Sequence, residues 1–570
     1  MMDSIGSQDD PLLQLKPKDC VRDSADGPSG FKLFVLSVAF AAACALTAAL
    51  WYSSEDDPSP SSAIYWTETL SPSYQIIESI PVSHYALEPI PSSLPTHEAE
   101  INMLNGARST IDVTAMYWNL LPLQDQTNCN ETAGGLSYET CLALGGDRGE
   151  AVYEAFEDAA ERGVQIRFLL SYTTNETGSS SISRQVTDLT DKYDNVQYKI
   201  WNAKDWYDGG IMHQKLWIVD NIHTYIGSSN MDWLSLAQVK EMGVVIWNST
   251  SWGGESWDLF ESWWNWSSMI RRDEAGNAVS EPGVLTSSYF SYIHQRNLTV
   301  PCWSHYVNGV ERCEYPTSMI PSHMPHNINK PMPLTVTPSN SPSSFYLTSA
   351  PFETVGSDPR HGSARTFDLD GILHTIRTAK TYVKLSVMDF APSNSFDKLW
   401  WGSLNDAILS SIYAAGIDVQ LLLSYWAHTE PGMVEYLDAL EAQGQVCKAN
   451  NVKCGKLEIK MFQIPGWNKT LDYPNTTEPI DPVFPTYSRV AHGKFVVTDN
   501  RVNVGTSNYQ WSYFYQVAGC SLNTDDEGIR QGVEDAFNRD WESSYSTRLD
   551  NFTDDNVWLN EKRLGTRRYV

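Results

Sequence analysis

Two short motifs in this 570-residue sequence place a histidine and a lysine two residues apart. The first is His213-Gln-Lys215, and the second is His492-Gly-Lys494. Residues two apart on an extended chain project to the same side, so each motif would present an imidazole and an ammonium group together. Two such pairs, brought face to face, would suit one phosphodiester. One histidine would attack phosphorus to give a phosphoramidate, and the other would protonate the leaving oxygen and later activate water.

The same further residues follow each motif. An aspartate comes five positions after each lysine, as Asp220 and Asp499, and then come Gly-Ser-Ser-Asn230 and Gly-Thr-Ser-Asn508. The lysines and the two asparagine amides would hold the non-bridging phosphate oxygens. Both aspartates lie an odd number of steps from their histidines, so we expect them to face away and to support the fold.

The chemistry of these motifs needs no metal or other cofactor. A lysine two residues from each histidine would oppose a bound cation. A catalytically inactive scaffold with the same fold is an alternative to an enzyme, and the intact histidine pairs argue against it.

The elements around the motifs are written twice along the chain. Residues 163–172 match 416–425. Helix-like sequence precedes each stretch and a short apolar run lies within it, as expected of a helix followed by a buried strand. The helix predicted at 98–107 corresponds to the helix at 369–379. The strands at 111–117, 196–201 and 213–221 correspond to those at 383–390, 457–462 and 492–500, respectively. The repeat predicts an α/β fold of two lobes, with the active site at their interface.

The segments outside the repeat define the predicted domain boundaries. Residues 281–344 are rich in Pro, Ser and Asn, which is typical of a connection. The predicted organisation is a cytosolic tail at 1–32, a transmembrane anchor at 33–52, a stalk at 53–68, a first half at 69–280, this connection, and a second half at 345–570.

Residues 33–52 form an uncharged run long enough to span a bilayer. Basic residues precede the run and Glu55, Asp56 and Asp57 follow it, so the N-terminus should stay cytosolic and the rest should be lumenal. A cleaved signal peptide is the alternative, but 30 mainly polar residues before the run favour an uncleaved anchor. In the tail, Asp9 with Leu12 and Leu13 has the form of a sorting signal toward endosomes and lysosomes.

Modification sites agree with a lumenal catalytic part. All eight glycosylation sequons follow the apolar run. They begin at Asn130, Asn175, Asn248, Asn265, Asn297, Asn468, Asn475 and Asn551. Sequence proximity suggests disulfides between Cys129 and Cys141, Cys302 and Cys313, and Cys447 and Cys454, which leaves Cys520 alone, although spacing does not fix connectivity.

Composition limits how a substrate can be held. The formal net charge is -29, so a broad basic surface that grips nucleic acid through many phosphates is excluded. Phosphate recognition must therefore be local. Hydrophobic residues make up 42% and aromatic residues 12%, which allows a sizeable core.

The paired motifs resemble those of the phospholipase D superfamily. Further stretches resemble its type II membrane branch, which holds the third and fourth animal phospholipase D paralogues. They are the run from Ile76 to Pro81, the run from Asn230 to Gly243, and Arg539-Asp-Trp541 with Tyr545-Ser546. The resemblance covers nearly everything after the apolar run.

This resemblance implies a metal-independent 5'-3' exonuclease that acts on single-stranded DNA and RNA in an acidic compartment. A lipid transphosphatidylation activity is also attributed to the branch. Delivery from the endoplasmic reticulum and Golgi to lysosomes, release of a soluble form by proteolysis, and homodimers are further expectations.

Three differences or matches with the branch bear on mechanism. The second motif ends in Asp499 where the relatives tend to have Glu, and Cys520 stands where they have another residue. Glu241 matches the acidic residue that would hydrogen-bond a catalytic imidazole, and its counterpart by position is Gln516. A carboxylate makes an imidazole more nucleophilic. We therefore hypothesise that His213, paired with Glu241, attacks phosphorus, and that His492, supported by Gln516, is the acid.

Two substrate classes remain open from the sequence. A nuclease acting on single strands would use aromatic side chains near the cleft, and Trp426 would either stack on bases or pack in the core. The alternative is a phospholipid phosphodiesterase or transphosphatidylase, which membrane anchoring favours.

Overall fold

The protein is described here from a computed structural model. It describes residues 71–83, 87–172, 182–203, 210–267, 270–272, 278–280, 286–290, 297–301, 325–355, 365–394, 399–430, 432–466 and 484–552. All of them belong to one compact unit that begins at Glu68. The predicted tail, anchor and stalk lie outside these ranges. Within the ranges, no helix has both the length and the apolar character needed to cross a membrane.

Eight strands form the first sheet. They are β1 (Ser73–Ser79), β2 (Ser93–Pro95), β3 (Thr110–Ala115), β5 (Gln165–Ser171), β6 (Val196–Trp201), β7 (Leu216–Val219), β8 (His223–Gly227) and β10 (Glu241–Trp247). Their order across the sheet is β2-β1-β10-β8-β7-β3-β5-β6. β3, β5 and β6 are parallel to one another, and β7 runs antiparallel to β3.

The second sheet contains ten strands. They are β15 (Met332–Thr335), β16 (Pro342–Ser349), β17 (Thr366–Phe367), β18 (Tyr382–Val387), β21 (Asp418–Ser424), β22 (Leu457–Phe462), β23 (Phe495–Thr498), β24 (Val502–Gly505), β25 (Ser521–Thr524) and β26 (Ser546–Arg548). Its main order is β15-β16-β25-β24-β23-β18-β21-β22-β26, and β17 pairs with β16.

The two sheets repeat one topology. The run β1-β10-β8-β7-β3-β5-β6 in the first sheet corresponds strand for strand to β16-β25-β24-β23-β18-β21-β22 in the second. The predicted duplicated α/β fold is therefore confirmed. The second sheet also takes in residues 332–344, which the sequence analysis assigns to the connection. The apolar residues Phe345 and Leu347 draw β16 into the core.

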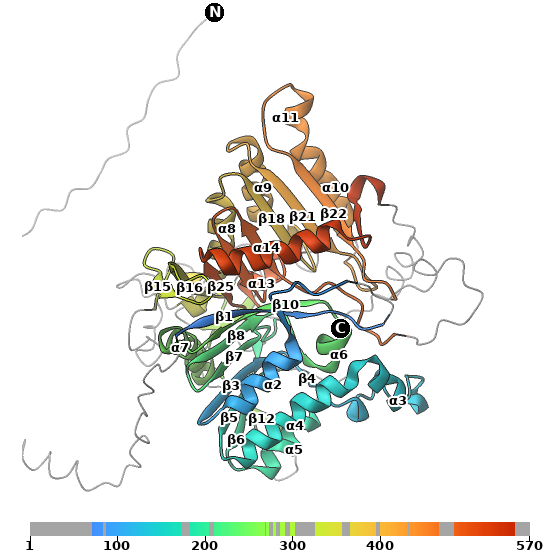
Figure 1. Cartoon of the computed structure of the whole chain (residues 1–570), viewed down its shortest axis with the longest axis vertical. Helices are drawn as coiled ribbons and strands as arrows, with labels where there is room; N and C mark the ends of the chain where they lie inside the picture. Colours follow the sequence, from blue (N-terminus) through green and yellow to red (C-terminus); the bar gives the residue numbers. More distant parts are fainter. Residues whose placement is uncertain are drawn as a thin grey trace, which may run out of the picture. The chain divides into compact units, whose positions relative to one another are not determined.

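Helices cover the outer face of each sheet (Figure 1). On the first sheet these are α2 (Thr96–Gly106), α4 (Asp147–Glu161) and α5 (Arg184–Lys192), and on the second they are α8 (Asp368–Arg377), α9 (Ser403–Tyr413) and α10 (Met433–Gly444). Two further helices, α7 (Thr250–Trp266) and α14 (Glu527–Glu542), join the core that the sheets share. In α14, Asp526 caps the first turn, and Ile529, Val533 and Phe537 recur at helical spacing to form the buried face.

The inner faces of the two sheets share one hydrophobic core. Ile218 and Val244 of the first sheet belong to the same cluster as Val497 and Leu522 of the second. Short β-branched runs such as Phe495–Thr498 pack well on a buried sheet face. The two lobes therefore form one body, which fixes the catalytic motifs against each other.

Two of the predicted disulfides are present, Cys129 to Cys141 and Cys447 to Cys454. Cys520 is a buried free thiol, and the Cys302 to Cys313 pairing lies outside the described residues.

Some of the predicted glycosylation sites can be located. Asn265 and Asn551 are exposed, and Asn130 and Asn248 are partly exposed. Asn175, Asn468, Asn475 and the side chain of Asn297 lie outside the described residues.

Candidate active site

Each histidine motif lies in an extended segment just before a strand, and it is held by the opposite half of the chain. The backbone N–H of His213 donates to the carbonyl of Ala518 at 3.0 Å, and that of His492 donates to the carbonyl of Lys240 at 2.8 Å. The imidazole centroids of His213 and His492 lie 6.4 Å apart. One phosphorus atom between them would be within reach of both rings.

The two motif lysines complete a buried cationic site. Lys215 Nζ donates to the carbonyl of His213 at 2.9 Å, and Lys494 Nζ donates to the carbonyl of His492 at 2.6 Å. Burial lowers the pKa of Lys494 to about 8, although Glu241 opposes this shift. Burial and the neighbouring Lys494 ammonium hold the pKa of Lys215 well below its usual value. An anionic phosphate would relieve this repulsion.

The two asparagines have different partners in the two halves. Asn230 Nδ2 donates to the hydroxyl of Tyr117 at 3.3 Å, whereas Asn508 Nδ2 donates to Asp389 Oδ2 at 3.1 Å. The Tyr117 hydroxyl donates in turn to Asp232 at 2.7 Å. The sequence analysis missed Tyr117 and Asp389. Each lies two residues beyond a parallel strand, β3 or β18, at the carboxyl edge where such sheets bind ligands.

Glu241 pairs with His492, so the predicted pairing with His213 is wrong. Both carboxylate oxygens of Glu241 lie 2.9 Å from His492 Nδ1, and Ser228 Oγ donates to Oε2 at 2.5 Å. The negative charge of Glu241 raises the pKa of His492, but burial, the largest effect, leaves that pKa below its usual value. The His492 charge and hydrogen bonds lower the pKa of Glu241 despite burial.

Gln516 is not the counterpart of Glu241. The short helices α6 (Trp233–Ala237) and α13 (Trp511–Tyr515) occupy matching places, and they end at Gln238 and Gln516 respectively. Counting on from those ends places Gly519 opposite Glu241. Glu241 already occupies His492 Nδ1, so the predicted support of His492 by Gln516 is also wrong.

His213 has no carboxylate partner of this kind. Its Nδ1 is buried, and no side chain among the described residues accepts its proton. Burial and the charges of Lys215 and Lys494 hold the pKa of His213 well below its usual value, and the Thr506 carbonyl opposes this only weakly. The ring of Tyr513 packs edge-on against His213, with centroids 5.2 Å apart. The two imidazoles therefore differ electrostatically although the fold is duplicated.

The two motif aspartates point away from the imidazoles. Asp220 accepts the backbone N–H groups of residues 108–110 at 2.7–2.9 Å. Asp499 accepts those of Lys380 and Thr381 at 2.8 and 3.1 Å. Each carboxylate thus ties the end of one strand to the beginning of its neighbour, β7 to β3 or β23 to β18.

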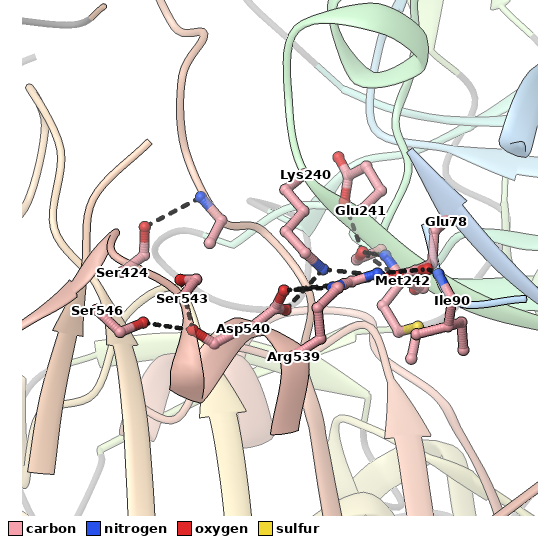
Figure 2. Close-up of polar contacts among 12 residues, drawn as sticks. Glu78, Ile90, Lys240, Glu241, Met242, Ser424, Arg539, Asp540, Ser543 and Ser546 are labelled. Atoms are coloured by element: carbon pink, nitrogen blue, oxygen red, sulfur yellow. Dashed lines mark hydrogen bonds and ion pairs between the residues drawn. The ribbon is translucent and has the colours of Figure 1, made fainter. Parts of the chain in front are cut away.

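A buried ionic network of Glu78, Lys240, Arg539 and Asp540 lies beside Glu241 (Figure 2). Lys240 Nζ lies 3.5 Å from Glu78 and 2.9 Å from Asp540, while Arg539 lies 2.6 Å from Glu78 and 2.9 Å from Asp540. Burial would raise the pKa of Glu78, but the charges of Lys240 and Arg539 outweigh it and lower that pKa to about 2. The network fixes the backbone of Lys240, which holds His492.

Trp426 packs in the core. Its side chain is 9% exposed and lies in a cluster with Trp233 and Val490. This outcome favours core packing of Trp426 over base stacking.

Within the described ranges, no group of three or more His, Cys, Asp or Glu side chains is arranged to hold a metal ion.

Comparison with known families agrees with this geometry. Residues 139–264 match the family described as "Cardiolipin synthase, PLD-like domain", and residues 343–467 match "PLD3/4, PLD-like domain". With its duplicated sheets and paired histidine motifs, the chain is a phosphodiesterase of the phospholipase D superfamily.

Within that superfamily, the chain resembles the proteins called PLD3. It is 27% identical to 5'-3' exonuclease PLD3 of Rattus norvegicus over 84% of this chain and 81% of the relative. It is 26% identical to the Homo sapiens protein of the same name over the same shares. Phospholipase D Z of Dictyostelium discoideum is 28% identical over 85% of this chain and 92% of the relative.

Among solved structures, phosphatidylserine synthase of Haemophilus influenzae is similar at a TM-score of 0.47 and 10% identity. The match covers 82% of this chain and 90% of that chain.

Proposed function

We propose that the protein hydrolyses phosphodiesters through a covalent intermediate on His492. The observation that carries this assignment is the 2.9 Å contact between Glu241 and His492 Nδ1. A carboxylate that accepts the Nδ1 proton fixes the tautomer, leaves Nε2 free, and stabilises the charge that develops on the ring as it attacks. This assignment reverses the roles expected from the sequence.

His213 then serves as the acid and later as the base. In the first step, His492 Nε2 forms a bond to phosphorus, the bond to the leaving oxygen breaks, and His213 gives that oxygen a proton. In the second step, water loses a proton to His213 and attacks phosphorus, and the N–P bond breaks. Lys215, Lys494 and the amides of Asn230 and Asn508 hold the non-bridging oxygens throughout.

This division of labour favours acidic surroundings. The acid must carry a proton, and the pKa of His213 lies well below its usual value. A lumenal compartment of low pH would protonate a larger fraction of it. The predicted type II topology and the endosomal or lysosomal destination are consistent with this requirement.

The substrate we propose is the 5' end of single-stranded DNA or RNA. The similarity to proteins named 5'-3' exonuclease PLD3 supports exonuclease activity. Four catalytic side chains, His213, Lys215, His492 and Lys494, are each at most 7% exposed, which favours a strand entering alone over a duplex. The relative named phospholipase D Z supports the second candidate, a phospholipid phosphodiesterase or transphosphatidylase.

A trapping experiment tests the mechanism. With a nucleotide p-nitrophenyl diester, whose leaving group needs no protonation, His213→Ala should release p-nitrophenolate and accumulate the nucleotidyl group, joined through phosphorus, on His492. His492→Ala should form no adduct. Mass spectrometry of acid-sensitive adducts, quenched in base, identifies the modified residue. An adduct on His213 in His492→Ala would instead support the prediction from the sequence that His213 is the nucleophile.

The substrate is tested in parallel on the wild-type protein. Single-stranded oligonucleotides blocked at either end should be degraded from the free 5' end at pH 5, and duplexes should be degraded much more slowly. Turnover of phospholipid with an alcohol acceptor, without turnover of any oligonucleotide, would establish the second candidate instead.

A further inference from the structure

A cavity of about 190 Å³ lies at the carboxyl edge of the first sheet. The parallel strands β3, β5 and β6 end there, and the segment from Met116 to Trp118 forms part of its wall. The same edge carries the first histidine motif, because Thr114 at the end of β3 accepts from Leu216 at the start of β7. The cavity therefore lies on the catalytic side of the sheet.

Two hydrogen bonds connect the cavity wall to the catalytic residues. Ser171 Oγ accepts the backbone N–H of Met212, the residue before His213, at 3.0 Å. The hydroxyl of Tyr117 accepts from Asn230 Nδ2 at 3.3 Å. A group bound in the cavity would therefore lie near a phosphate held at the histidines. Ser171 connects the cavity wall to the residue before His213, and Tyr117 connects it to Asn230.

The chemistry of the wall suits a flat, neutral ring. Leu170, Ile182 and Ile200 supply apolar surface, and the lining contains no charged side chain. Tyr117 is 36% exposed, and its hydroxyl bond to Asp232 fixes the ring. Trp118 is 5% exposed, and its indole N–H has no acceptor among the described residues.

Size and charge separate the candidate ligands. Sites for drug-sized molecules measure roughly 300–1,000 Å³, so this cavity takes a single ring system and not a pair of acyl chains. A lipid headgroup that carries an ammonium would enter a wall without a counter-charge, which is costly. A nucleobase is neutral, planar and rich in acceptors.

The second half differs at the matching place. The residue that corresponds to Tyr117 is Asp389, which binds Asn508, and the next residue, Phe390, is 1% exposed. An acidic side chain replaces the aromatic one, so the two sides of the phosphate site are chemically distinct. Such a difference would orient a strand in one direction.

We propose that this cavity binds the nucleobase of a nucleotide that flanks the scissile phosphate. The proposal rests on the proposed nuclease function and assigns it a base subsite on the first lobe. Stacking of a base on an aromatic side chain contributes about 1–3 kcal/mol, which corresponds to roughly 5- to 150-fold in kcat/KM.

The test compares a normal single-stranded oligonucleotide with one that carries abasic residues on both sides of the first scissile bond. Wild-type protein should cleave the normal strand at least about fivefold faster. In Ile182→Trp, an indole at the cavity should reduce that ratio to near one and leave the abasic rate unchanged. Arg184→Trp is the matched control, because Arg184 does not line the cavity and its side chain is 81% exposed. It should keep the wild-type ratio.

Several outcomes would overturn the proposal. Equal cleavage of the normal and abasic strands by the wild-type protein would do so without any variant. The proposal would also be wrong if Ile182→Trp kept the wild-type ratio of normal to abasic cleavage. It would likewise be wrong if Ile182→Trp lost phosphatidylcholine turnover and kept its cleavage of oligonucleotides. A wild-type protein that cleaves lipids and no oligonucleotide would instead refute the proposed function itself.

Discussion

Glu241 in the first half of the chain contacts Nδ1 of His492 in the second half at 2.9 Å, across 251 positions of sequence. Among the residues that the structure describes, no equivalent carboxylate serves His213, and Gly519 occupies the position that matches Glu241. A duplicated fold therefore carries an asymmetric active site. In the proposed mechanism this asymmetry makes His492 the nucleophile and His213 the acid, and the first prediction follows from it.

Replacing Glu241 should impair catalysis far more than replacing Gln516. Glu241→Gln removes the charge that supports His492, so kcat should fall by at least about 100-fold with little change in KM. Gln516→Ala should remain within about threefold of wild type, since Gln516 supports neither imidazole. Steady-state kinetics on one oligonucleotide decides it, and the opposite ranking would contradict the assigned pairing.

Acidification should speed cleavage only when the leaving group needs a proton. The pKa of His213 is well below its usual value, so its protonated fraction grows as pH falls from 7 to 5, by up to about tenfold per unit. A natural diester should follow this rise in single-turnover rate, and a p-nitrophenyl diester should not. Parallel pH dependences for both substrates would exclude His213 as the acid of the first step.

Activity should decline on the alkaline side as Lys494 loses its charge. Its pKa of about 8 means that the ammonium is present below pH 8 and is lost above it. Arginine stays charged throughout this range. With the p-nitrophenyl diester, which needs no proton from His213, Lys494→Arg should therefore flatten the alkaline limb of kcat/KM even if the absolute rate falls. The same measurement on Lys215→Arg shows how much of the alkaline decline in kcat/KM is caused by loss of the Lys215 charge. An unchanged limb in both variants would remove the lysines as its cause.

The ionic network behind His492 should stabilise the fold at about pH 5. Glu78 has a pKa of about 2 in the folded protein against an ordinary value of 4.5. Its contribution is therefore complete above about pH 4.5 and is lost as pH falls toward 2. Glu78→Gln should lower the free energy of unfolding by about 3–5 kcal/mol at pH 5, and by less below pH 4.

Urea denaturation at several pH values measures this effect. Glu458→Gln is the control, because the Glu458–Arg548 pair is more than one third exposed and should contribute less than about 1 kcal/mol. Equal stability of Glu78→Gln and wild type at pH 5 would show that the network carries no net stabilisation.

The sequence alone determined the chemistry and the architecture. Each His-x-Lys motif is a local pattern, and its recurrence with matching strands and helices predicts two lobes around one phosphate site. The disulfides at Cys129 and Cys447 also join residues close in sequence. Such features depend on neighbours along the chain, so spacing and periodicity reveal them.

Only the tertiary structure decided how the site is divided. Counting positions within one half cannot tell which half's imidazole a carboxylate faces, because the strands of the two lobes exchange contacts at Ala518 and Lys240. The partners of Asn230 and Asn508 likewise lie more than 100 positions away in the sequence. The cavity beside Tyr117 brings together residues between Met116 and Ile200. Those contacts depend on which distant strands become neighbours within each sheet, and the contact between Glu241 and His492 depends on the packing of the two lobes. No local pattern encodes either arrangement.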